Sequence, residues 1–208
     1  MTFLEPDGRP LIGEVVRLDL LQPSDAAELF DALDDARVYL GGYGGGPAGR
    51  HTSMEQTAAQ IDASIADPTM RGYAVRLVGE VGGLSAGTLV GTTTLGDILT
   101  PHGIAHVGWT GYAPAVWGTA VNPECKLLIL GHAFDTCGFG RIKIQTDGIN
   151  AHSQAAIAKL GAVREGVLRR HRVRADGTFR DTVVFSILDT EWAHVRSRLE
   201  TRLAALTP

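Results

Sequence analysis

Residues 109–161 contain two consecutive strand-to-helix junctions, and this arrangement restricts the fold more than any other part of the sequence. Residues 104–112 are predicted to form a strand, which Pro114 ends because proline cannot donate to a strand ladder. Apolar residues then recur at helical spacing from Leu127 to Phe134. A second strand is predicted at 141–147, and a second helix follows it. The start of each helix presents unpaired N–H groups that could bind a phosphorylated cofactor.

Both helix starts carry residues that favour capping. The first helix is predicted to begin near Asn122, because Asn is a favoured N-cap and Pro123 has its φ preset for the first turn. Asn150 is predicted to cap the second helix, which places Ser153 at the third helical position. Gly161 is predicted to close that helix as its C′ residue.

The rest of the chain is predicted to alternate between short strands and helices. Further strands are predicted at 14–20, at 73–78, at 87–95 and on either side of the turn 175–177, and further helices after Pro23, after Thr52 and at 190–205. Residues 41–49 are too glycine-rich for either regular element. Thr52 to Glu55 is interpreted as a capping box, with Ala58, Ile61 and Ile65 on the inner face of the helix that follows.

Composition favours one globular domain. A chain of 208 residues with 44% apolar and 20% charged residues can bury one substantial core. Its formal charge of −4 gives no general attraction to nucleic acid or to an anionic membrane. No apolar run is long enough to span a bilayer, and the N-terminus lacks the order of a secretion signal. A cytoplasmic location is therefore expected.

The two cysteines, Cys125 and Cys137, both fall on the first predicted helix. At the standard helical rise they are about 18 Å apart, which is too far for a disulfide within one chain. Neither has a second Cys or a suitably spaced His pair beside it, so no zinc site is expected. Both are interpreted as small apolar residues, buried or half-buried.

The two junctions resemble those of the Gcn5-related N-acetyltransferase (GNAT) superfamily, and in particular its branch of ribosomal-protein N-terminal (RimJ/RimL-like) acetyltransferases. In that branch a Trp-Gly turn, here Trp117-Gly118, precedes the cofactor helix. An Asn-x-x-Ser segment that ends in Leu-Gly-Ala is matched by Asn150, Ser153, Leu160, Gly161 and Ala162. The resemblance extends from about Gly13 to the tail.

The resemblance implies an α/β (α+β) fold in a single acetyltransferase domain over residues 1–208, with its core at about 13–205. The sheet would be mixed and mostly antiparallel, twisted, with about seven strands flanked by helices. Two splayed central strands would hold the cofactor between them.

The implied co-substrate is acetyl-coenzyme A, without a metal ion. Its diphosphate would rest on the first helix N-terminus, and its pantetheine arm would follow the strand 107–112, where one backbone N–H would face the thioester oxygen. The cofactor-binding residues implied are Trp109, Thr110, Trp117, Gly118, Thr119, Ala120, Val121, Asn122, Lys126, Asn150 and Ser153. For Trp109 and Tyr112 the alternative is a plain core role, and for Lys126 a solvated surface lysine.

The pyrophosphate loop departs from the superfamily pattern. That pattern has Gln or Arg, two variable residues, Gly, one variable residue, then Gly or Ala. Trp117, Ala120 and Asn122 occupy the three fixed positions here. Asn122 adds a side chain where the diphosphate normally approaches closely, which predicts weaker cofactor binding.

Two catalytic residues are expected, Ser153 and His171. In the family a serine at the position of Ser153 hydrogen-bonds the coenzyme sulfur and protonates the departing thiolate; its alternative role is to cap the helix. Ribosomal-protein members carry a glutamate base where this chain has Arg172. His171, Asp181 and His106 remain as candidate bases, and His171 has a suitable ordinary pKa. An amine that arrives already deprotonated is the alternative.

The expected acceptor is a protein N-terminus or a small amine, attacked directly in a ternary complex. A coenzyme A binding or sensing module with little turnover, and an antibiotic or amino-acid acetyltransferase, are the alternatives. A basic group on the closing hairpin is interpreted as a solvated face that discourages edge pairing; it consists of Arg164, Arg169, Arg170, Arg172, Arg174 and Arg180. A homodimer is considered because relatives often pair, whereas membrane and nucleic-acid partners are not expected.

Overall fold

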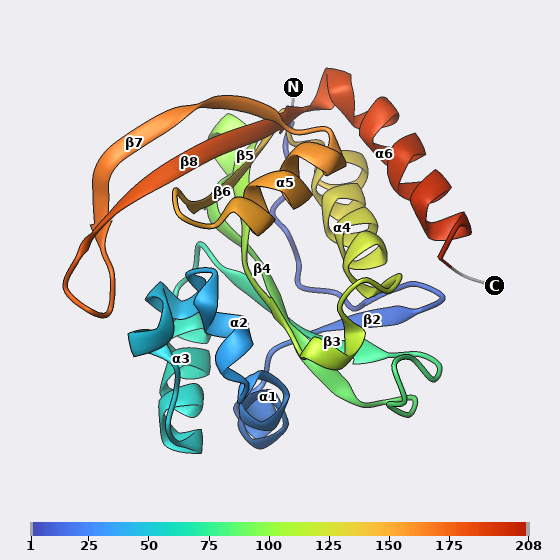
Figure 1. Cartoon of the computed structure of the whole chain (residues 1–208). Coiled ribbons are helices and arrows are strands. Elements are labelled where there is room, and N and C mark those ends of the chain that lie inside the picture. The colour runs from blue at the N-terminus through green and yellow to red at the C-terminus, as the bar shows by residue number, and fades with distance from the viewer. Residues whose placement is uncertain (1, 207–208) are drawn as a thin grey trace.

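The computed structural model describes residues 2–206, and its strands form one sheet in the order β1-β2-β3-β4-β5-β6-β8-β7 (Figure 1). The strands are β1 Leu11–Ile12, β2 Val16–Leu20, β3 Arg71–Leu77, β4 Leu89–Leu99, β5 Ile104–Tyr112, β6 Arg141–Asp147, β7 Val163–Val173 and β8 Phe179–Leu188. Neighbours in this sheet are antiparallel except β5 and β6, which run parallel. The predicted mixed, mostly antiparallel sheet is confirmed. It has eight strands rather than about seven, because the short β1 pairs with β2.

Helices cover both faces of the sheet (Figure 1). They are α1 Ala26–Leu33, α2 Ala36–Leu40, α3 Met54–Ala66, α4 Val121–Gly131, α5 Ala151–Leu160 and α6 Asp189–Ala204. On one face α4 packs against the sheet and α6 packs against α4 and β8, and Ile129, Val195 and Val107 belong to the same core. A second, smaller core joins α1 and α3 to the other face through Leu29 and Ile61. The sheet therefore separates two helical layers, α4 to α6 on one side and α1 to α3 on the other.

The strands β5 and β6 pair only near their starts. Three registered pairs join them, beginning with Ile104↔Arg141 and ending with His106↔Lys143. Beyond that point β6 pairs only with β8, and β5 only with β4. The register between β4 and β5 also shifts here, so that Trp109 and Thr110 form a β-bulge in which Trp109 has φ +48°. The splayed central strands that were expected are present.

The long antiparallel pair β7 and β8 forms an arm that curves away from the rest of the sheet (Figure 1). The turn at its tip contains Gly177 with φ +82°, the left-handed conformation that glycine adopts readily, as predicted for this hairpin. Gly161 likewise ends α5 with φ +104°, which confirms its prediction as a helix terminator.

Some sequence predictions about helix ends are wrong. Helix α4 begins at Val121 with Ala120 at its N-cap, so Asn122 lies inside the first turn and does not cap it. The capping box at the start of α3 does not form as predicted, since Gln56, and not Glu55, accepts the Thr52 backbone N–H at 2.7 Å. In the same helix Ile61 is buried as predicted, but Ile65 is exposed.

Two further differences lie in the segment before α3. A short helix, α2, which was not predicted, precedes the glycine-rich segment. Inside that segment the chain forms two 3-10 turns, Tyr43–Gly45 and Pro47–Gly49, rather than irregular loop throughout.

Candidate active site

Two helix N-termini meet at the edge where β5 and β6 separate. Because these strands are parallel, their carboxyl ends lie at the same edge of the sheet. Helix α4 follows the end of β5 through a 3-10 turn at Pro114–Val116, and α5 follows the end of β6 after a short turn. Both helices therefore begin beside the gap and present the positive ends of their dipoles there.

The turn before α4 contains the predicted cofactor loop. Trp117 is half exposed, and its Nε1 donates to the Tyr112 backbone oxygen at 2.9 Å. Gly118 has φ +77°, and no atom lies near the position of a Cβ, so its backbone conformation is the reason for glycine here. Thr119 stabilises the turn, because its Oγ1 donates to the Val116 oxygen and accepts from the Val121 N–H. The loop is ordered by contacts within the protein.

Lys126 turns inward from α4 toward the bulge of β5. Its Nζ lies 3.0 Å from Thr110 Oγ1 and 3.4 Å from Thr93 Oγ1. Burial lowers the pKa of this ammonium. The side chain points to the sheet, which does not fit the solvated alternative, and the phosphate contact stays a prediction.

At the second helix start, Asn150 caps α5 as predicted, because its Oδ1 accepts the Ser153 N–H at 2.9 Å. Ser153 is partly exposed at the third helical position. The glycine-rich segment packs against this start: a Cβ on Gly41 would lie 2.8 Å from Asn150 Nδ2. Glycine at position 41 thus allows the segment to approach the capping side chain.

The glycine-rich segment 41–49 spans the gap between the ends of β5 and β6. On the β5 side, a Cβ on Gly111 would lie 2.8 Å from the Tyr43 ring. On the β6 side, a Cβ on Gly42 would lie 3.2 Å from Asp147 Cβ. The tip of the β7–β8 arm also contacts the segment, where the Ala175 N–H donates to the Gly45 oxygen. The segment therefore lies beside the ends of β5 and β6 and beside the tip of the arm.

A cavity of about 300 Å³ lies between the helices α1 and α3 and the sheet. It is lined by Leu21, Leu29, Gln60, Ile61, Ala63, Ser64, Asp67, Met70, Thr92, Thr94 and Trp109. Asp67 is the one charged residue in this lining. Trp109 lies on the bulge, so the cavity reaches the strand segment where the thioester is expected. Tyr112 is instead buried in the core beside Cys125, which favours its core alternative.

Two histidines lie near the gap in different surroundings. His106 on β5 is buried, and its Nδ1 lies 3.5 Å from Asp97 Oδ2. His171 on β7 is exposed, and its Nδ1 lies 3.1 Å from Thr182 Oγ1. Desolvation is the largest cause that lowers the pKa of each imidazole. Asp181, the third candidate base, accepts the Arg170 backbone N–H at 2.7 Å.

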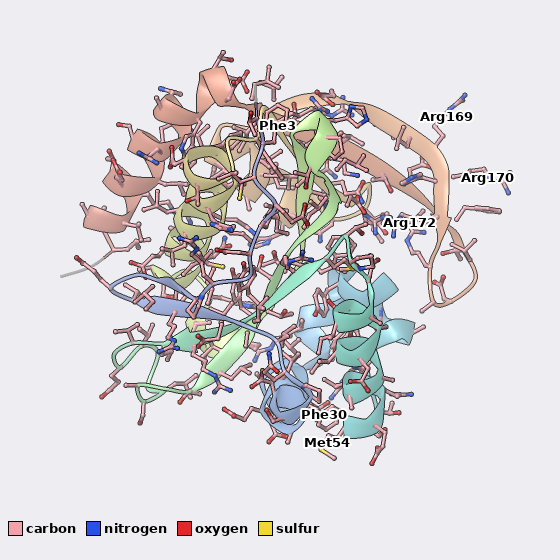
Figure 2. The ribbon with its side chains drawn as sticks, turned by 180° about the vertical axis from the view of Figure 1, so that it is seen from behind. Phe3, Phe30, Met54, Arg169, Arg170 and Arg172 are labelled. Atoms are coloured by element: carbon pink, nitrogen blue, oxygen red, sulfur yellow. The ribbon has the colours of Figure 1, made fainter. Side chains whose placement is uncertain are left out.

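The arginines of the closing hairpin do not form one solvated face. Arg169 and Arg170 lie on the outer side of the arm, whereas Arg172 lies on the side facing the rest of the molecule (Figure 2). Arg174 is largely buried against Asp147, and Arg180 is close to the same carboxylate. The prediction of a solvated arginine face is therefore wrong for Arg174 and Arg180.

Sequence reasoning missed two buried carboxylates. Asp147 accepts from Arg174, and Glu124 in the first turn of α4 accepts the backbone N–H groups of Glu14, Val15 and Val16 at 2.6 to 2.9 Å. For Glu124 the available signal was an acidic residue inside an otherwise apolar helix start. Its partners lie about 110 residues away in the sequence, so only the fold identifies them.

Other kinds of site are not found among residues 2–206. No group of three or more His, Cys, Asp and Glu side chains in this part of the chain could hold a metal ion. Cys125 and Cys137 are buried free thiols, as their interpretation required. No described helix is long and apolar enough to cross a membrane.

Known proteins share this architecture. A family model for the acetyltransferase (GNAT) domain matches residues 16–163, more than half of the chain. A protein from T. thermophilus that carries a provisional acetyltransferase assignment is 31% identical, with a TM-score of 0.78 over 94% of this chain and 97% of its own. No curated protein matches the sequence.

Two more distant structures show the same fold. A GCN5-related N-acetyltransferase from Brucella melitensis has a TM-score of 0.83 at 23% identity, covering 97% of this chain and 88% of its own. Mycobacterium smegmatis RimJ, solved in complex with CoA-disulfide, has a TM-score of 0.74 at 23% identity, covering 97% of each chain. The splayed sheet, the two helix starts and the family match together show that this chain belongs to the GNAT family of acetyltransferases.

Proposed function

We propose that the protein transfers the acetyl group of acetyl-coenzyme A to a primary amine, either a protein N-terminus or a small amine, in a ternary complex. One observation carries the proposal: β5 and β6 separate after three pairs, and both α4 and α5 begin at the edge of the resulting gap. On the opposite face of the sheet the cavity behind Trp109 leaves room for an acceptor. The two substrates would thus approach the bulge from different sides.

The residues around the gap fit coenzyme A. In the turn before α4 the N–H groups of Trp117, Thr119 and Val121 are bonded within the protein, whereas the Gly118 N–H has no partner in the described chain. This N–H and the positive end of the α4 dipole suit a diphosphate. The free edge of β5 suits the amides of pantetheine, and one backbone N–H near the bulge would stabilise charge that develops on the thioester oxygen. The fold likeness to RimJ, which was solved with CoA-disulfide, supports the same ligand.

Ser153 is proposed as the proton donor to the departing thiolate. Its backbone N–H is occupied by the Asn150 cap, but its side chain is partly exposed at the gap. His171 is the base that the sequence favours; its exposed ring lies on the arm, where an acceptor peptide could reach it.

The residues that line the cavity indicate the charge of the acceptor. The cavity lining contains one carboxylate, Asp67, and no Lys or Arg, which favours a cationic amine over an anionic acceptor. The RimJ-like resemblance favours a protein N-terminus. A cytoplasmic location, a homodimer and a single domain over residues 1–208 remain predictions from the sequence.

The proposal is tested by calorimetric titration with acetyl-coenzyme A and with free coenzyme A. Thiol release is then measured on the same samples with N-terminal peptides, amino acids, aminoglycosides and polyamines. Binding with amine-dependent thiol release supports the transferase and identifies the acceptor class. Binding without release for every amine favours the sensing module. Absence of binding rejects the proposal and shows that Trp117, Ala120 and Asn122 mark a lost cofactor loop.

A further inference from the structure

His106 is an unusual buried residue because its Nε2 has no hydrogen-bond partner within the described chain, whereas its Nδ1 lies 3.5 Å from Asp97 Oδ2. The residue is only 3% exposed. Buried polar atoms without partners are rare in folded proteins and commonly mark a catalytic or water-mediated role. His106 also occupies the last paired position before β5 and β6 separate, opposite Lys143. The His106 ring therefore lies where the gap between β5 and β6 begins.

The ring leans along β5 toward the bulge. A Cβ on Gly108 would lie 2.6 Å from His106 Cε1 and 2.7 Å from its Nε2, so only glycine at position 108 allows this orientation. The Trp109 ring covers the imidazole, with centroids 4.8 Å apart. Nε2 thus faces the bulge, and Trp109, which lines the cavity, is the side chain between it and the acceptor space.

Strand pairing places His106 on the cavity face of the sheet. In an antiparallel pair, residues directly opposite each other point to the same face. His106 pairs with Gly96, and Gly108 pairs with Thr94, which lines the cavity. The imidazole therefore shares a face with the proposed acceptor site and lies across the sheet from α4.

Asp97 orients the other side of the ring. Its Oδ2 lies 3.5 Å from His106 Nδ1 and 2.7 Å from Lys143 Nζ. A carboxylate beside Nδ1 favours the proton on that nitrogen and leaves the lone pair on Nε2, the atom that faces the bulge. The three side chains form a chain of contacts from β6 through β4 to β5.

We propose that His106, positioned by Asp97, accepts the proton that the acceptor ammonium must lose before it attacks. This inference rests on the proposed function. Nε2 takes one proton from the ammonium, directly or through one water after Trp109 moves aside, and later releases it to solvent. The amine lone pair forms the new N–C bond, the C–S bond breaks, and the second amine proton reaches the thiolate through Ser153. Each proton is accounted for, and no further reactant is needed.

The charged groups around His106 make the assignment specific. Asp97 on β4 raises the pKa of the imidazole, whereas Lys143 on β6 and Arg172 on β7 lower it, and desolvation lowers it most. The net pKa is below the usual value, so the ring is neutral near pH 7 and able to accept a proton. An α-amino group, with an ordinary pKa of about 7.7–8.0, suits this base better than a side-chain amine near 10.4. This favours α-amine acceptors.

The test compares His106→Gln with His171→Gln, the competing candidate base, and with His194→Gln on the exposed face of α6 as the control, using a peptide with a free α-amine as the probe. We expect His106→Gln to lower kcat/KM about 100-fold at pH 7 while the Kd for acetyl-coenzyme A stays within about twofold, and the His194→Gln control to stay within about threefold. Loss in His171→Gln alone, or wild-type activity in His106→Gln, overturns the inference. Failure of the wild type to release thiol with any amine instead rejects the proposed function, and this inference with it.

Because His106 is buried, its variant could fail to fold, and surface variants provide a second measurement. The pH profile of kcat/KM is compared for Asp97→Asn and Lys143→Met. Asp97→Asn should move the acidic limb to lower pH, since the carboxylate raises the pKa of His106, and lower the plateau about tenfold. Lys143→Met should move the same limb to higher pH. Opposite shifts support proton transfer through His106, whereas unshifted limbs or shifts in one direction overturn it.

Discussion

Arg174 donates two hydrogen bonds to Asp147, from Nε at 2.7 Å and from a terminal nitrogen at 2.8 Å, and so joins the tip of the β7–β8 arm to the carboxyl end of β6. The Asp147 side chain is only 2% exposed. It also accepts the Ile149 N–H in the turn before α5 and lies against Gly42 of the glycine-rich segment. One carboxylate therefore links the tip of the arm to the turn before α5 and lies beside the glycine-rich segment.

Asp147→Asn should destabilise the protein by about 1.5 kcal/mol, because Arg174 loses the carboxylate that accepts two of its charge-assisted hydrogen bonds. Urea unfolding measures the change, with Asp62→Asn on the exposed face of α3 as the control. Equal midpoints for the two variants would show that the Asp147 pair contributes nothing to stability.

The contribution of Asp147 should also depend on pH. Burial alone raises the pKa of its carboxyl, but Arg174, the Ile149 N–H and Arg180 outweigh it, so the pKa in the folded protein is lowered. A lowered pKa gives stability that is complete above the unfolded value of about 3.9 and is lost as the pH falls through the folded value. The difference in unfolding free energy between wild type and Asp147→Asn should be constant from pH 7 to 5 and shrink below pH 4. A difference that grows toward low pH would contradict this sign.

Glu124 ties the start of α4 to the turn between β1 and β2. Glu124→Gln should lower the free energy of unfolding by about 2 kcal/mol. In the wild type three backbone N–H groups share the two carboxylate oxygens of Glu124, whereas the amide of glutamine has only one acceptor oxygen for them. Gly13→Ala should act on the same contact, since its Cβ would lie 2.4 Å from Glu124 Cδ. Thermal unfolding compares both with Glu200→Gln on exposed α6. If Glu124→Gln has the same unfolding temperature as Glu200→Gln, the hydrogen bonds of Glu124 to residues 14–16 do not stabilise the protein.

Substitutions of Ser153 and Asn122 should affect different parameters, turnover in the first case and coenzyme affinity in the second. Ser153→Ala should lower kcat about 100-fold with little change in the Kd for acetyl-coenzyme A, because it removes a proton donor and leaves the loop intact. Asn122→Asp should instead raise that Kd about tenfold by placing a negative charge beside the diphosphate. Steady-state kinetics and calorimetry on both variants test this division. Equal effects on both parameters in either variant would refute it.

Lys126→Met should stabilise the protein at pH 7 by an amount on the order of 1 kcal/mol, because it removes a buried ammonium whose partners are hydroxyl groups. Burial lowers the pKa of Lys126, so the cost of its charge is present at neutral pH and disappears as the pH rises toward 10. Unfolding at pH 7 and 9.5 checks this trend. The same variant tests the predicted phosphate contact: unchanged affinity for acetyl-coenzyme A rejects it, and a tenfold loss supports it.

The sequence was sufficient for the elements whose signals are local. The alternation of residues 141–147 and the span 104–112 match β6 and β5 as the structure has them. Asn150 and Gly161 delimit α5 as predicted, because a cap and a left-handed glycine act within a few residues. The prediction that Asn122 caps α4 is wrong, because the helix begins at Val121 and Ala120 occupies the N-cap position.

Tertiary contacts decided the chemistry of the site. His106 was one of three candidate bases in the sequence, and its burial, its unpartnered Nε2 and the contact of its Nδ1 with Asp97 follow from the pairing of β4, β5 and β6. Arg174 and Arg180 were predicted to be solvated, but in the folded arm both lie beside Asp147. The sequence by itself determined the order of the strands and helices apart from β1 and α2, and the cap of α5, because periodicity and capping are short-range properties. Only the fold decided which side chains lose water and which charges meet, because those depend on residues that are distant along the chain.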